Sequence, residues 1–263
     1  MRIAGETVVL TGATGGIGRV LARRLAGAGA DLVVTGRDGE QLRRLAEPLG
    51  ARWVRADLGA PGGAAELAEA CADARILVAN AALPASGDLL EYTPAQIERA
   101  LSVNLGSAIH LARLLAPAMV EQGRGHLVFV GSMSGKAATP QSSLYTASKF
   151  GLRGFAHALR LDLRGAGVGV SLVQPGFVAE AGMFARTGAP LPRGARAVTP
   201  DQVADAVLRA IARDRAEINP APVRLRLSCA LAAQLPTVAA RLLSRGGPDE
   251  SGRLIVEAQR AAR

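Results

Sequence analysis

Short apolar runs alternate along the chain with longer stretches in which apolar residues recur every three or four positions. The runs predict strands over Thr7–Thr11, Leu32–Thr35, Trp53–Val54, Ile76–Ala79, His126–Val130 and Val168–Val173. The longer stretches, such as Ile17 to Ala28, predict amphipathic helices. Strands that are apolar throughout are typical of a sheet buried on both faces. The βαβ order therefore predicts an α/β fold, a doubly wound parallel sheet with helices on both faces.

Several helix starts carry capping signals. Asp38 precedes an apolar pattern and is followed three residues later by Gln41, which is a capping-box spacing. Thr93-Pro94 and Thr199-Pro200 each pair an N-cap residue with a proline suited to the first helical turn. These pairs predict two further helices, and residues 142–164 also carry a helical pattern.

The last third of the chain is less regular. Residues 179–198 are rich in Gly, Ala and Pro and have no clear period, which predicts a long loop placed to act as a substrate lid. Glu217–Val223 predicts a final strand, and Leu227–Leu243 predicts an amphipathic helix in a short C-terminal helical extension over 224–263. Since no repeat or low-complexity linker interrupts the sequence, residues 1–263 are expected to form a single domain.

The composition excludes disorder, because 49% of the 263 residues are hydrophobic. Near the C-terminus, the longest uncharged apolar run is Leu227–Ala240, which is too short to span a bilayer, so no membrane span is expected. The N-terminal apolar run enters a glycine-rich turn instead of a cleavage site, so secretion is not expected. Cys71 and Cys229 are therefore expected to be reduced, buried thiols of a cytoplasmic protein.

The formal net charge is +9, and residues 186–263 contribute 13 arginines against 7 acidic residues. These arginines are scattered singly between apolar residues, a pattern typical of a solvated face. One Trp, two Tyr and five Phe are too few to build a platform on which bases would stack. We therefore expect no nucleic-acid partner.

A glycine-rich turn follows the first predicted strand directly, in the sequence TGATGGIG at 11–18. Glycines permit a tight turn there and let backbone N–H groups approach a pyrophosphate at a helix N-terminus. Because the turn joins a strand to a helix in a βαβ unit, it predicts dinucleotide binding rather than a merely structural turn. The residues expected to hold the cofactor are Gly12, Thr14, Gly15, Gly16, Ile17 and Gly18.

The end of the second strand indicates which dinucleotide binds. An acidic side chain there would accept hydrogen bonds from a ribose 2′-hydroxyl, whereas an arginine would hold a 2′-phosphate. The strand runs into Gly36-Arg37-Asp38, and Asp38 is explained as a helix cap. Arg37 therefore favours NADP(H). NAD(H) stays open, because a solvated turn residue also explains Arg37.

Tyr145 and Lys149 are four residues apart in a helical pattern, so their side chains lie on one helix face. Lys136 is the only other lysine in a chain with 31 lysines and arginines, so this pairing is not expected by chance. A phenol has a pKa of about 10, and an adjacent ammonium favours the phenolate, which brings proton transfer toward neutral pH. The alternative is a surface cation–π pair.

Together these motifs resemble the short-chain dehydrogenase/reductase family over nearly the whole chain, from Val8 to about Ala212. The matching segments are TGATGGIG at 11–18, Asp57-Leu58, Asn80-Ala81-Ala82, Asn104 in VNLG, Ser132 in VGSMSG, YTASK at 145–149 and Pro175-Gly176. Each motif alone is weak, but their joint order and spacing are specific. The resemblance implies a single Rossmann-type domain, no metal site, and a homodimer or homotetramer.

By this resemblance the catalytic residues are Asn104, Ser132, Tyr145 and Lys149. Tyr145 would be the general acid/base, and Ser132 would hydrogen-bond the same substrate oxygen. Lys149 would bind the nicotinamide-ribose hydroxyls and lower the pKa of Tyr145, while Asn104 would hold a water that links Lys149 to solvent. The structural alternatives are a helix kink at Asn104 and a strand-end cap at Ser132.

The resemblance also implies further cofactor contacts. Asp57 would contact the adenine ring, and Asn80 would lie near the adenine ribose and steady the sheet. The other residues in this set are Leu58, Ala81, Pro175, Gly176 and Val178.

Two features depart from the family pattern. The fourth residue after Gly176 is Glu180, where the family has a Thr that binds the nicotinamide carboxamide, so anchoring would come from backbone, for example at Val178. The glycines also fit two spacings, one through Gly16 as in ordinary reductases and one through Gly15 as in the longer epimerase and dehydratase branch. The chain length after Pro175 and the presence of Asn104 favour the ordinary branch.

The substrate side is expected to be apolar. The residues that would form it are Met133, Phe177, Met183, Phe184 and Leu191. They predict a hydrophobic ketone or secondary alcohol, although they are also explained as loop packing. The alternatives are a 3-oxoacyl thioester drawn by Arg186, Arg193 and Arg196, and a non-catalytic NADPH-binding sensor. The C-terminal extension would close the pocket, join subunits or rest on an anionic membrane surface, and we do not favour the last of these.

Overall fold

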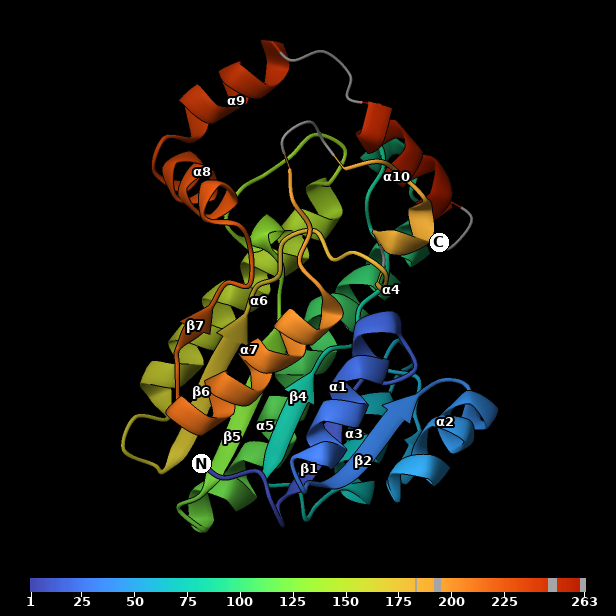
Figure 1. Ribbon diagram of the computed structural model, residues 1–263, viewed down its shortest axis with the longest axis vertical. Helices are drawn as coiled ribbons and strands as arrows, with labels where there is room; N and C mark the ends of the chain where they lie inside the picture. The colour runs from blue at the N-terminus through green and yellow to red at the C-terminus, as the bar shows by residue number, and fades with distance from the viewer. Residues whose placement is uncertain (183, 192–194, 246–249, 261–263) are drawn as a thin grey trace.

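The computed structural model describes residues 1–182, 184–191, 195–245 and 250–260. Met183 and Arg193, and the side chain of Arg186, lie outside this description. A parallel sheet of seven strands forms the centre of the molecule, in the order β3-β2-β1-β4-β5-β6-β7 (Figure 1). The strands are β1 (Thr7–Leu10), β2 (Asp31–Gly36), β3 (Arg52–Arg55), β4 (Ile76–Ala79), β5 (Gly125–Val130), β6 (Val168–Val173) and β7 (Glu217–Ile218). The predicted doubly wound fold is confirmed.

Helices connect the strands and continue beyond the sheet. They are α1 (Gly16–Gly27), α2 (Gly39–Ala46), α3 (Gly63–Ala70), α4 (Pro94–Leu101), α5 (Ser107–Glu121), α6 (Ser143–Asp162), α7 (Pro200–Arg213), α8 (Val223–Gln234), α9 (Pro236–Arg245) and α10 (Glu250–Arg260). A π-helical turn, η3 (Ser102–Gly106), joins α4 to α5. The predicted N-caps are confirmed, since Asp38, Thr93 and Thr199 each accept a backbone hydrogen bond from the residue three positions on.

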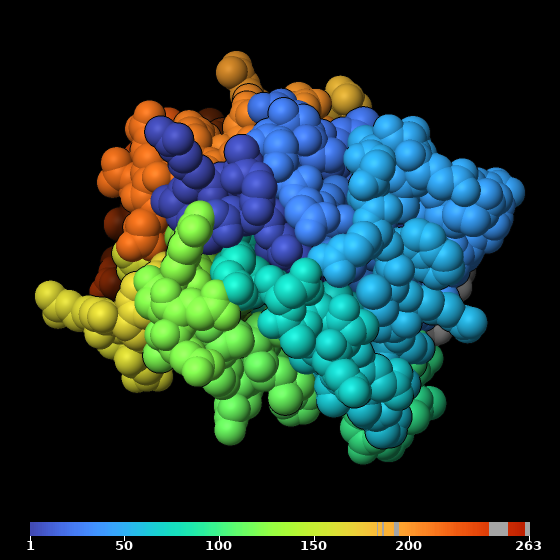
Figure 2. All heavy atoms as spheres, turned by 90° about the horizontal axis from the view of Figure 1, so that it is seen from below, coloured from blue at the N-terminus to red at the C-terminus, as the bar shows by residue number. Residues whose placement is uncertain are grey.

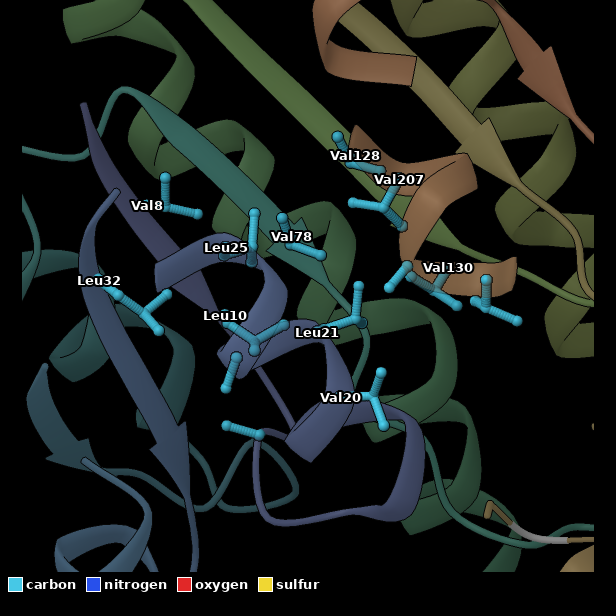
Figure 3. Close-up of a cluster of buried hydrophobic side chains, with 14 of the residues drawn as sticks. Val8, Leu10, Val20, Leu21, Leu25, Leu32, Val78, Val128, Val130 and Val207 are labelled. Atoms are coloured by element: carbon cyan, nitrogen blue, oxygen red, sulfur yellow. The ribbon is translucent and has the colours of Figure 1, made fainter. Parts of the chain in front are cut away.

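Two apolar layers cover the sheet, one on each face. Alternate strand residues face opposite layers: Val8 and Leu10 pack with α1 and α7, whereas Val9 packs with α3 and α5. Figure 3 shows the first layer, where Leu21 of α1 lies against the strand residues Leu10 and Val78. Burial on both faces explains why the central strands β1 and β4 are apolar almost throughout.

The stretch Pro94–Glu121 is the one described helical segment that is long and apolar enough to cross a membrane by length and composition. Half of its most apolar window is buried, and Leu111, Leu115 and Met119 of α5 belong to the layer against the sheet. It is therefore explained as a core helix. Cys71 and Cys229 are both buried and free, as predicted.

The end of the sheet at which the strands begin is closed by the N-terminal segment. The amino group of Met1 donates to the carbonyl of Ile211, at 3.2 Å, and Arg124 pairs with the carboxylate of Glu6. Seen from below, the dark blue N-terminal segment accordingly lies between the orange and green segments (Figure 2). The opposite end of the sheet, where the strands finish, is the end that carries the functional motifs.

The C-terminal extension differs from the prediction. The final strand covers only Glu217–Ile218, because Pro220 and Pro222 follow it and cannot donate backbone hydrogen bonds. The single helix predicted over Leu227–Leu243 is wrong: α8 ends at Gln234 and α9 begins at Pro236. A proline inside a helix removes one backbone hydrogen bond and clashes with the preceding turn, whereas it suits a first turn.

The last helix, α10, returns to the body of the molecule. Gln259 accepts a hydrogen bond from the backbone N–H of Ser86, at 3.0 Å, and Arg260 pairs with Glu91. By contrast, α8 buries only Cys229 and exposes Leu227 and Leu231. In Figure 1, α8, α9 and α10 all lie beyond the end of the sheet at which the strands finish.

Candidate active site

The glycine-rich turn is so tightly built that two of its glycines leave no room for a side chain. Gly12 has φ +63°, and a Cβ there would lie 2.8 Å from Cα of Ala81. A Cβ on Gly18 would lie 2.1 Å from the carbonyl oxygen of Gly12. The backbone between β1 and α1 therefore stays bare and partly accessible, with the N-terminus of α1 beside it. This arrangement fits a pyrophosphate.

Polar contacts hold this turn against the end of β4. The hydroxyl of Thr11 accepts hydrogen bonds from the backbone N–H groups of Asn80 and Ala81, both at 3.0 Å. The side-chain amide of Asn80 donates to the carbonyls of Thr11 and Gly12, at 3.1 and 3.2 Å. Asn80 therefore braces the turn itself.

The ends of β2 and β3 bring Arg37 and Asp57 close enough to interact electrostatically. Arg37 is exposed, and its carbonyl accepts from Nε of Arg55 at 3.1 Å. Burial disfavours the Asp57 carboxylate, but the backbone N–H of Gly59 and the guanidinium of Arg99 outweigh it and, with Arg37, hold the pKa of Asp57 below its usual range. Arg99, 3.1 Å from Asp57, is a neighbour that no motif in the sequence indicated.

The loop after β6 returns onto the glycine-rich turn. A Cβ on Gly16 would lie 2.4 Å from the backbone nitrogen of Gly182. The base of the loop is held by a parallel bridge between Val178 and Val198. Glu180, at the departure from the family pattern, is exposed and has φ +63°. The segment expected to act as a lid therefore contributes a wall to the proposed pyrophosphate site.

Ser132, Tyr145 and Lys149 come together from two elements at the finishing end of β5. Ser132 lies just beyond β5 and opens the turn η4 (Met133–Gly135), where its hydroxyl accepts from the N–H of Ser134 at 3.1 Å. Tyr145 and Lys149 lie on α6, and the Ser132 hydroxyl is close enough to Tyr145 to lower the pKa of its phenol. Nζ of Lys149 lies 5.7 Å from the ring centroid of Tyr145 and donates to the carbonyl of Val130 at 3.3 Å.

The comparisons with known proteins agree with this geometry. A model of the family described as short chain dehydrogenase matches residues 6–190. The chain belongs to this family. Ketoacyl reductase HetN from Nostoc sp. is 34% identical over 225 residues, which are 82% of this dehydrogenase and 78% of the relative. The ordinary, single-domain branch indicated by chain length is confirmed.

Solved structures of the family superpose on nearly the whole chain. A short-chain dehydrogenase from Sphingobium yanoikuyae in complex with NADPH has a TM-score of 0.77 at 30% identity, over 93% of this dehydrogenase and 97% of that chain. The bulky-bulky ketone specific alcohol dehydrogenase from Comamonas testosteroni has a TM-score of 0.75 at 25% identity, over 93% and 95% of the two chains.

The pKa of Tyr145 differs from the value that the sequence led us to expect. Burial raises the pKa of Tyr145, and the neighbouring Ser132 hydroxyl only partly offsets this effect. Burial also lowers the pKa of Lys149, to about 8. The expected fall in the Tyr145 pKa is therefore wrong for the protein alone, because the cost of desolvating a phenolate exceeds the stabilisation that the neighbouring groups provide.

Asn104 lies in the π-helical turn and makes a contact that the motif did not indicate. Its Oδ1 accepts from the backbone N–H of Leu83 at 2.6 Å, and its Nδ2 donates to the carbonyl of Leu83 at 3.0 Å. The side chain of Asn104 thereby fixes the segment after β4 of this dehydrogenase. The kinked-helix alternative for Asn104 and the cap alternative for Ser132 both describe real local features.

Proposed function

We propose that this member of the family transfers a hydride between NADP(H) and a hydrophobic ketone or secondary alcohol, with Tyr145 as the general acid/base. The observation that carries the proposal is the placement of the Ser132 hydroxyl next to Tyr145, on the helix that also bears the buried Lys149. A non-catalytic NADPH sensor would not need this arrangement. The chain is thus proposed to be an enzyme. We also propose that it acts in the cytoplasm.

Each polar group of the site has a defined chemical task in this proposal. The bound nicotinamide supplies or accepts the hydride. The Tyr145 hydroxyl gives its proton to the carbonyl oxygen in reduction and removes it from the alcohol in oxidation. Ser132 donates a hydrogen bond to the same oxygen and stabilises its developing charge. The Lys149 ammonium, still largely protonated at neutral pH, favours the phenolate and binds ribose hydroxyls.

The cofactor is proposed to lie along the finishing ends of the strands. The glycine-rich turn would hold the pyrophosphate, Asp57 would face the adenine, and Arg37 would hold a 2′-phosphate. The NADPH complex of the Sphingobium structure supports this choice. The residues proposed to contact the cofactor are Gly12, Thr14, Gly15, Gly16, Ile17, Gly18, Arg37, Asp57, Leu58, Asn80, Ala81, Tyr145, Lys149, Pro175, Gly176 and Val178.

An apolar substrate is supported by the side chains near the site. Met133 is buried directly after Ser132, and the rings of Phe177 and Phe184 lie 5.0 Å apart in the loop after β6. The bulky-bulky ketone specificity named for the Comamonas enzyme favours a free ketone. The ketoacyl reductase from Nostoc favours the second candidate, a 3-oxoacyl thioester. Assays on matched free and thioester-linked oxoacyl substrates separate the two, and activity on thioesters alone would overturn the first.

The test of the main proposal is a side-by-side titration with NADPH and NADH, followed by a panel of hydrophobic ketones and alcohols. We expect tighter binding of NADPH and turnover of ketones. Absence of turnover with every substrate, despite cofactor binding, would support the sensor instead. We also propose a homodimer or homotetramer, which light scattering on the purified protein would test.

A further inference from the structure

A partly buried cluster of polar and charged side chains lies next to the proposed catalytic residues and has no part in the chemistry assigned so far. Its centre is Glu217, at the start of β7, whose side chain is 15% exposed. Its carboxylate pairs with Nζ of Lys136, accepts a hydrogen bond from Nε of Arg153 at 3.1 Å, and lies 2.9 Å from Nε2 of His157. Asn219 adds a hydrogen bond from Nδ2 at 3.0 Å.

Apart from Asn219, the partners of Glu217 come from the two segments that carry the catalytic residues. Lys136 directly follows the turn η4 that Ser132 opens. Arg153 and His157 lie one and two helical turns after Lys149 on α6, at positions four residues apart. One carboxylate therefore ties the turn that begins at Ser132 to the helix that bears Lys149.

Close packing makes this tie sensitive to small displacements. The N–H of Met133 donates to the carbonyl of Pro175 at 2.9 Å, which fixes the start of the turn to the end of β6. A Cβ on Gly135 would lie 2.7 Å from the backbone carbonyl oxygen of Lys149, so the turn and α6 are in direct contact. When Lys136 is released from Glu217, the turn loses its only ion pair among the described residues.

We propose that Glu217 is a positioning residue, which sets the hydroxyl of Ser132 against Tyr145 by holding Lys136 and α6 in one geometry. Hydrogen bonds from its partners outweigh burial and lower the pKa of Glu217 to about 2, so the carboxylate is ionised at neutral pH. The effect on turnover rests on the proposed function. A displacement of about 1 Å of a positioned group costs about 100-fold in rate.

The test compares Glu217→Gln with Asp214→Asn. Asp214 is a matched control, because its carboxylate also pairs with a residue of α6, Arg160, at 2.7 Å. Among the described residues, it has no hydrogen bond or ion pair to the turn that Ser132 opens. Lys136→Met is a second variant that leaves Glu217 with Arg153 and His157, should Glu217→Gln fail to fold. Hydrogen exchange of residues 131–141 is measured in each folded variant, without any substrate.

We expect faster exchange over 131–141 in Glu217→Gln and Lys136→Met but not in Asp214→Asn. Unchanged exchange in both test variants would overturn the proposal, even if the protein had no dehydrogenase activity. This readout therefore separates failure of the positioning role from failure of the proposed function.

An independent test compares the effect of Glu217→Gln on activity in two backgrounds, wild type and Ser132→Ala. With the wild-type Ser132, Glu217→Gln is expected to lower kcat about 10-fold to 100-fold with little change in the KM for the cofactor. In the Ser132→Ala background the same substitution is expected to change kcat less than 3-fold, because the group it positions is gone. An equal loss in both backgrounds would show a general structural role and overturn the proposal.

Discussion

The side-chain amide of Asn104 pairs with both backbone groups of Leu83, accepting from its N–H at 2.6 Å and donating to its carbonyl at 3.0 Å. The two residues are 21 positions apart, and the contact joins the π-helical turn to the segment that leaves β4. Asn104 is buried, and its amide supplies the hydrogen bonds that water would otherwise make to these two backbone groups at the edge of the active site.

Replacement of Asn104 by Ala is expected to lower the free energy of unfolding by about 1–3 kcal/mol, because the backbone groups of Leu83 lose their partners in a partly buried place. Urea denaturation measures the change. The control is Ser107→Ala, which removes a buried hydroxyl bonded only to the carbonyl of Val103 within the same helical segment. A loss no larger than that of the control would contradict the role of Asn104.

Tyr145→Phe is expected to lower turnover at least about 1000-fold and to leave the cofactor Kd within about 3-fold, since only the proton-transferring hydroxyl is removed. The matched control is Tyr92→Phe, because Tyr92 is the other tyrosine and its hydroxyl donates to the Ser86 carbonyl instead. Steady-state rates and fluorescence titrations measure both quantities. Residual turnover near the wild-type rate would exclude Tyr145 as the general acid/base.

Gly18→Ala is expected to weaken cofactor binding at least about 10-fold and to destabilise the fold by about 2 kcal/mol or more, because its Cβ would meet the Gly12 carbonyl oxygen. Gly27→Ala, on the same helix, is the control, since a Cβ there meets nothing within 4 Å. The control is expected to stabilise the protein by up to about 1 kcal/mol. Equal effects of the two substitutions on cofactor affinity would contradict the assignment of the turn.

Arg37→Ala is expected to weaken NADPH binding about 10-fold and to leave NADH binding unchanged, because only NADPH carries the 2′-phosphate. Arg44→Ala provides the control, since Arg44 is an exposed residue of α2 that pairs with Glu40. Isothermal titration with both cofactors gives the comparison. Parallel losses for NADPH and NADH would instead assign Arg37 to the turn alone.

His126 is expected to make the fold sensitive to mild acid. Burial lowers its pKa to about 4, and its Nε2 lies 2.8 Å from the Ser171 hydroxyl. The unfolded chain takes up this proton at the ordinary pKa, so below about pH 6.5 it binds more protons than the folded protein and stability falls as the pH falls. From pH 7 to pH 5 the expected loss is about 2 kcal/mol.

Urea titrations of the wild type and of His126→Gln at the two pH values check this expectation. The variant is expected to lose most of the pH dependence, whereas His110→Gln, at an exposed position of α5, is expected to keep it. The same slope in all three proteins would assign the acid sensitivity to other groups.

Features that depend on neighbours in the sequence were predictable. The caps at Asp38, Thr93 and Thr199 act over three residues, and Tyr145 and Lys149 share a helix face because a turn of helix separates them. The strand–glycine–helix order likewise determined the turn at Gly12 and Gly18. These are local contacts, so the residue types and their spacing contain the information.

The tertiary structure alone decided the contacts between distant segments. Nothing near Glu217 in the sequence indicates Lys136, Arg153 or His157 as its partners, because only the folded sheet brings β7 beside the turn and α6. The same holds for Asn104 with Leu83 and for α10 against Ser86. Burial also reversed the expected shift of the Tyr145 pKa. Desolvation depends on how the whole chain packs around a group, and the sequence by itself does not contain that environment.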